Sequence, residues 1–107
     1  MRLIAIAFAA TGLLAAASSA TAAAAVSDVE FLKASRCRGL ADSGLTQVDT
    51  AAMDAFIRNE RSGRAPYVLE RSKVEYDKAK REAKSDSGDR KARLTAELSG
   101  PCQVYKG

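Results

Sequence analysis

The pattern of the first 25 residues limits which part of this chain forms the folded domain. Arg2 supplies one positive charge, an apolar run extends from residue 3 to residue 14, and small residues dominate the rest of the segment. A charged start, an apolar middle and an exit of the A-x-A type are the three parts of a secretory signal peptide. We therefore predict a signal peptide over residues 1–25, cleaved after Ala22 or Ala25, and an exported protein that is periplasmic or secreted.

An uncleaved membrane anchor is the alternative, because the uncharged run from Leu3 to Val26 is long enough to span a bilayer. The second half of this run is mainly alanine, serine and threonine, which partition weakly into hydrocarbon. The first cysteine, Cys37, follows a charged stretch instead of the small residues of a lipobox, so a lipoprotein is not predicted. We expect no transmembrane segment in the mature chain.

Two cysteines stand near the ends of the part that remains, residues 26–107. About 80 residues make one small domain, which buries only about 60 to 65% of the surface that its unfolded form exposes. Exported domains of this size often add a covalent cross-link. A redox-active or metal-binding pair is the alternative, but the chain has no C-x-x-C motif and no histidine. We predict a structural disulfide between Cys37 and Cys102, tying the first helix to the C-terminal tail.

Residues 26–31 carry the signals of a helix start. Ser27 and Glu30 have the spacing of a capping box, and apolar residues at either end of the segment have that of a hydrophobic staple. Gly39 or Gly44 would end this helix in a left-handed cap. The first helix is therefore expected to begin just after the leader and to carry Cys37.

Three more segments show apolar residues at helical spacing, which predicts an all-α fold, a small bundle of three to four helices. The first of these helices begins near Thr46 or Asp49 and stops before Ser62 and Gly63, the second runs from about Pro66 to Lys84, and the third from about Asp89 to Ser99. The second of the three carries a stripe of small residues that permits a close helix contact. Beyond the last helix, Val104 and Tyr105 are expected to pack back on the first helix through the disulfide.

Few groups in this chain suit catalysis. There is no histidine, the lysines lie in segments of alternating charge, and most carboxylates stand at helix starts or beside basic residues. Asp86 and Asp89 alone are too few ligands for calcium. We therefore expect a non-enzymatic protein with no cofactor and no metal.

An arginine cluster between the second and third predicted helices is the one local feature that indicates binding. Arg58, Arg61 and Arg64 flank the turn, and Tyr67 follows it. Guanidinium groups bind carboxylates and phosphates, and tyrosine adds contact area, so these four residues form a candidate binding edge. We prefer the simpler interpretation that Arg58 and Arg61 offset the dipole at a helix C-terminus.

Two functions fit this pattern. The first is a protein-interaction module of the cell envelope (an inhibitor, adaptor or stress-linked chaperone), because a thin core leaves apolar surface for another envelope protein to cover. The second is binding of an anionic surface, lipid or polysaccharide, through the basic edge. Beyond the leader, sixteen basic residues face thirteen acidic ones. That excess is too small to indicate nucleic acid as a partner.

Overall fold

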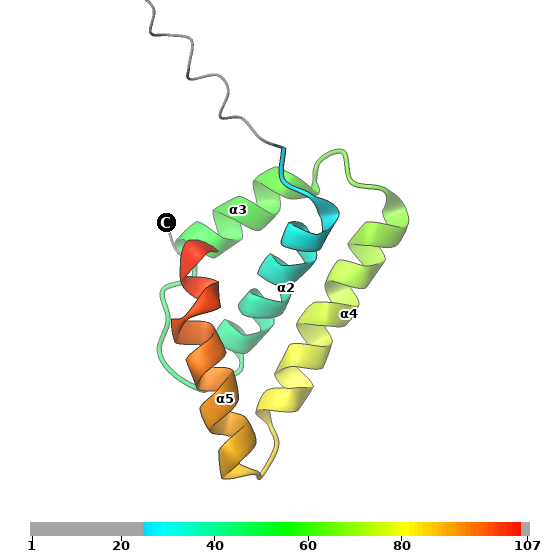
Figure 1. Ribbon diagram of the computed structural model, residues 1–107. Helices are drawn as coiled ribbons and strands as arrows, with labels where there is room; N and C mark the ends of the chain where they lie inside the picture. The colour runs from blue at the N-terminus through cyan, green and yellow to red at the C-terminus, as the bar shows by residue number, and fades with distance from the viewer. Residues whose placement is uncertain (1–24, 106–107) are drawn as a thin grey trace, which may run out of the picture.

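The structure, a computed structural model, describes residues 25–105. This range is all-α, as predicted, with four α-helices, one 3₁₀ helix and no strand (Figure 1). The elements are α2 (Asp28–Asp42), α3 (Ala51–Arg61), α4 (Pro66–Ala83), α5 (Gly88–Ser99) and the 3₁₀ helix η1 (Pro101–Tyr105). No helix in this range has an apolar stretch of the length that crossing a bilayer requires. The predicted leader lies outside the described residues except for Ala25, and its boundary with the domain 26–107 stays a prediction.

Helix α2 lies between α4 on one side and α3 and α5 on the other (Figure 1). Ser27 caps it, because Ser27 Oγ accepts the Glu30 N–H at 3.1 Å. In a complete capping box the Glu30 carboxylate would accept the Ser27 N–H. Here it accepts a hydrogen bond from Tyr105 Oη at 2.8 Å instead. The helix ends before Ser43, and Gly44 has a φ of 88°. Of the two glycines predicted to end the helix, Gly44 is the correct one.

Gly39 lies inside α2 at its close approach to α4, so the prediction that it could end the helix is wrong. A Cβ at this position would clash with the backbone carbonyl oxygen of Tyr76 and lie 3.0 Å from Ala79 Cβ. Ala34 on α2 and Ala79 on α4 are both fully buried. The stripe of small residues predicted on the third helix therefore permits the α2–α4 contact.

The later helices begin close to their predicted starts. Asp49 Oδ1 accepts the Ala51 N–H at 2.9 Å, so α3 follows the second of its two predicted starts. Helix α4 begins at Pro66, whose missing N–H is no loss at the first helical position. Ser87, and not Asp89, caps α5, with its Oγ accepting a backbone N–H at 3.2 Å.

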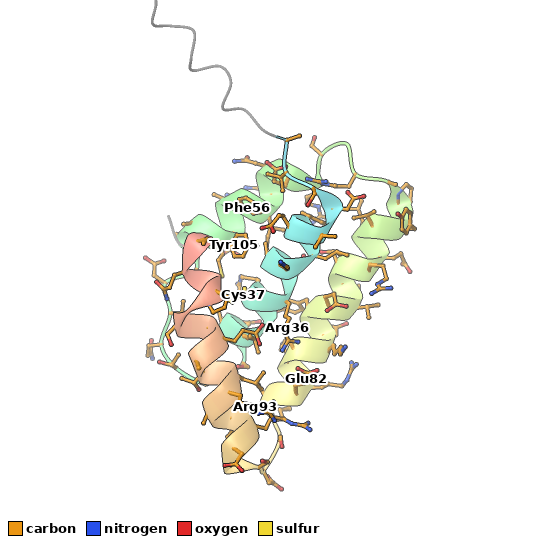
Figure 2. The ribbon with its side chains drawn as sticks, in the orientation of Figure 1. Arg36, Cys37, Phe56, Glu82, Arg93 and Tyr105 are labelled. Carbon is orange, nitrogen blue, oxygen red and sulfur yellow. A yellow bond between two sulfur atoms is a disulfide. The ribbon has the colours of Figure 1, made fainter. Side chains whose placement is uncertain are left out.

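The predicted disulfide joins Cys37 on α2 to Cys102 in η1, with Cα atoms 5.6 Å apart (Figure 2). Both cysteines are buried within one apolar core, which also contains Leu40, Met53, Ala79, Leu94 and Leu98. Tyr105 is buried as well, with its ring centroid 5.2 Å from that of Phe56. The predicted packing of the tail is therefore confirmed for Tyr105 and wrong for Val104, which is 73% exposed.

The hydroxyl of Tyr105 gives a pH-dependent prediction. Burial, followed by the hydrogen bond to Glu30, raises the pKa of Tyr105 to about 12. Because tyrosine ordinarily ionises near a pKa of about 10, the stability from this neutral phenol is fully present below about pH 10. It is lost as the pH rises towards 12. Tyr105→Phe should remove the step near pH 12 from a spectrophotometric tyrosinate titration, and persistence of that step would contradict the assignment.

Candidate functional site

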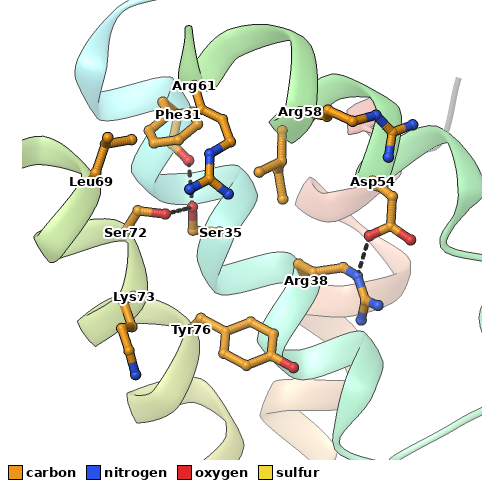
Figure 3. A pocket seen from close by; sticks show the side chains of 11 residues that line it. Phe31, Ser35, Arg38, Asp54, Arg58, Arg61, Leu69, Ser72, Lys73 and Tyr76 are labelled. Carbon is orange, nitrogen blue, oxygen red and sulfur yellow. Dashed lines mark hydrogen bonds and ion pairs between the residues drawn. The ribbon is translucent and has the colours of Figure 1, made fainter. Parts of the chain in front are cut away.

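A cleft of about 520 Å³ lies over α2, between α3 and α4 (Figure 3). This volume falls within the range of about 300 to 1,000 Å³ that is usual for ligand sites. Its apolar lining comes from Phe31, Ile57 and Leu69, one residue from each of the three helices. The cleft therefore exists only when all three helices are packed together.

Two serines lie among these apolar residues. Ser35 Oγ donates to the Phe31 carbonyl oxygen at 3.1 Å and lies 2.6 Å from Ser72 Oγ. Ser35 is 3% exposed, so this contact between α2 and α4 is largely shielded from water. Because the hydroxyls bond within the protein, the floor of the cleft is neutral and largely apolar.

One wall of the cleft is held by an ionic network. Arg38 Nε donates to Asp54 Oδ1 at 2.5 Å, and Arg38 Nη1 lies 3.6 Å from Asp42 Oδ1. The Asp42 carboxylate also accepts a hydrogen bond from Tyr76 Oη. This bond lowers the pKa of Asp42 and raises the pKa of Tyr76. The Arg38 guanidinium is thus ion-paired and the Tyr76 hydroxyl is hydrogen-bonded, while Arg38 Nη1 is buried without a hydrogen-bond partner among the described residues.

The rim of the cleft carries free positive charge. Arg58 and Arg61 extend from the last turn of α3 beside the cleft (Figure 3). Neither forms an ion pair within 4.0 Å among residues 25–105. Lys73, on the α4 side, is paired with Asp77 at 3.5 Å. Both arginines stand at the C-terminal end of α3, as a dipole role requires. Arg61 reaches over the cleft, whereas Arg58 lies on the side of Asp54 (Figure 3).

The other two residues of the predicted edge lie elsewhere. Arg64 makes contacts of 2.8 Å to Asp28 Oδ1, 2.8 Å to Val26 O and 3.0 Å to Glu60 Oε1. Its side chain is 12% exposed, so Arg64 fastens the start of α2 to the α3–α4 turn. Tyr67 is 69% exposed on the first turn of α4. The structure therefore brings only Arg58 and Arg61 of the four to this cleft.

Nine of the eleven lining residues were not among the predicted site residues, among them Arg38, Lys73 and Tyr76. Tyr76 lies on the inward-facing stripe of α4, where helical spacing places core residues. Its ring is half-buried, and its hydroxyl reaches Asp42 at the edge of the bundle. Helical spacing identifies which face of α4 points inward but not where that face borders a cleft.

The cleft thus offers a ligand two kinds of contact, cationic side chains and apolar surface. Across the part of the chain that the structure describes, no three His, Cys, Asp or Glu side chains lie close enough together to hold a metal ion. Comparison with protein-family models, with curated proteins and with solved structures finds no match for this chain.

Proposed function

We propose that this protein is an exported, non-enzymatic binding protein of the cell envelope whose cleft holds an acidic segment of another envelope protein. The observation that carries the proposal is the placement of two unpaired guanidinium groups, those of Arg58 and Arg61, beside an apolar floor. An apolar side chain of the partner would cover the floor. Neighbouring carboxylates would bind the guanidinium groups, whose planar donors match a carboxylate in bidentate geometry.

A protein segment suits the cleft because two different helices form its sides. A groove between helices accepts a helical or extended peptide, with apolar anchors that give affinity. The charged rim adds specificity and speeds the encounter. A volume of about 520 Å³ has room for more than one large side chain.

Export is supported by the leader pattern of residues 1–25 and by the disulfide between Cys37 and Cys102. Disulfides of this kind persist in oxidising compartments, such as the periplasm and the extracellular space.

The side chains in the cleft support a binding function over a catalytic one. The serine hydroxyls are bonded to each other and to the backbone, and the sequence has no histidine to serve as their base.

A random peptide library displayed on phage tests this proposal without presupposing the partner. The oxidised protein should select peptides in which Asp or Glu flanks a Leu, Ile or Phe residue. Selection with no such enrichment would contradict the proposal. If dodecanoate binds in the cleft while no selected peptide does, the protein is instead a carrier of small amphipathic anions.

Neutralising the rim should weaken binding of a selected peptide. For the double variant Arg58→Gln, Arg61→Gln we expect a loss of roughly tenfold or more in affinity, because two charge-assisted contacts are removed. Fluorescence anisotropy with the labelled peptide measures this loss. The matched control is Arg90→Gln, Arg93→Gln, which removes the same two charges from α5 and should leave peptide affinity unchanged. Equal losses in both variants would show that only net charge matters.

A further inference from the structure

Positive charge is concentrated at one end of this molecule. Residues 78–93, which comprise the end of α4, its connection to α5 and the first half of α5, hold seven basic and three acidic residues, a net charge of +4. The rest of residues 26–105 holds eight basic and ten acidic residues, a net charge of −2. Residues 26–105 together have a net charge of +2, so the positive charge of this end exceeds that of the whole range.

This segment exposes two carboxylates, those of Asp86 and Asp89, and six basic side chains, which we name the basic tip: Lys78, Arg81, Lys84, Arg90, Lys91 and Arg93. None of the six forms an ion pair within 4.0 Å among the described residues. The nearby Glu82 does not neutralise them, because its carboxylate binds Arg36 Nη1 at 3.0 Å (Figure 2). Elsewhere on the described surface, exposed cations such as Arg71 and Lys73 are paired with carboxylates one helical turn away, and Arg58 and Arg61 at the cleft are the exceptions.

Helix stability does not account for the whole of the basic tip. Arg81 and Lys84 stand at the C-terminal end of α4, where the helix dipole favours cations. Arg90 and Lys91 stand in the opposite position, in the first turn of α5, where the dipole disfavours them. Cations that are unfavourable for their own helix and unpaired within the domain point to a ligand outside it.

The composition of the tip favours binding to an anionic surface over binding to single-stranded nucleic acid. Between Asp77 and Val104 the sequence has no aromatic residue, so the tip lacks the stacking groups with which proteins bind single-stranded nucleic acid. Its cations come from α4, α5 and their connection, which lies at the end of the bundle opposite the start of α2 (Figure 1). We infer that the basic tip binds the anionic headgroups of a phospholipid bilayer, on a surface separate from the cleft.

Cosedimentation with vesicles tests this inference on protein purified in the form that the producing cell makes. We expect binding to vesicles of phosphatidylcholine mixed with phosphatidylglycerol, no binding to phosphatidylcholine alone, and loss of binding as salt is raised. Each Lys or Arg near an anionic surface contributes a factor of about five to binding. Arg90→Gln, Arg93→Gln should therefore lower the vesicle partition coefficient roughly 25-fold.

The cleft variant Arg58→Gln, Arg61→Gln is the matched control, because it has the same net charge and the same N-terminus. Its partition coefficient should fall less than about threefold, because charges beyond a Debye length from the bilayer are screened. Circular dichroism confirms that both variants are folded. Equal falls in both variants, or equal binding to neutral vesicles, would overturn the inference. Tighter binding to a DNA oligonucleotide than to anionic vesicles, lost in the tip variant, would assign the tip to nucleic acid instead.

Discussion

The double substitution Cys37→Ala, Cys102→Ala is expected to lower the free energy of unfolding by about 4 kcal/mol. The disulfide closes a loop across a sequence separation of 65 residues, and the chain-entropy relation gives this magnitude for such a loop. A domain of about 80 residues has a total stability of only about 4 to 12 kcal/mol. A large fraction of the variant should therefore be unfolded under mild conditions.

Urea unfolding followed by circular dichroism measures this loss. Alanine is the appropriate replacement because both cysteines are buried, and a serine hydroxyl would be left without a partner there. Changing both residues avoids a free thiol that could link two molecules. Wild-type protein in reducing agent is the control and should unfold near the midpoint of the variant. A midpoint equal to that of oxidised wild type would show that the loop contributes nothing to stability.

The local signals in the sequence were sufficient to predict the fold. Ser27 caps α2, Pro66 opens α4, and Leu94 and Leu98 face the core as their spacing predicts. The error at Gly39 has a physical cause. A glycine inside a helical pattern marks either an end or a close approach, and the residues that decide, Tyr76 and Ala79, lie far away in the sequence.

The candidate site was predictable only in part. Arg58 and Arg61 stand out as a cluster in sequence, but Arg64, three residues later, is directed to Asp28 on another helix. That contact depends on how the α3–α4 turn meets the start of α2, and residue types do not reveal it. Arg38 reaches the cleft only because α3 and α4 diverge over α2 (Figure 1).

Gly39→Ala is expected to lower the free energy of unfolding by about 2 kcal/mol, although alanine is the better helix former by about 1 kcal/mol. The new methyl group would clash with the Tyr76 backbone carbonyl oxygen and lie 3.0 Å from Ala79 Cβ. A carbonyl fixed in the α4 backbone cannot rotate aside as a flexible side chain would. Helices α2 and α4 would therefore have to move apart, which disturbs the buried contacts on both sides of Gly39.

Gly88→Ala supplies the matched control, because Gly88 is also helical and a Cβ there would have nothing within 4 Å. The same substitution at this position should leave stability unchanged or raise it by up to about 1 kcal/mol, since alanine restricts the unfolded chain. Urea midpoints of the two variants then separate crowding from helix propensity. If Gly39→Ala were as stable as Gly88→Ala, α2 and α4 would have to adjust freely, and the small-residue contact would not determine how closely they pack.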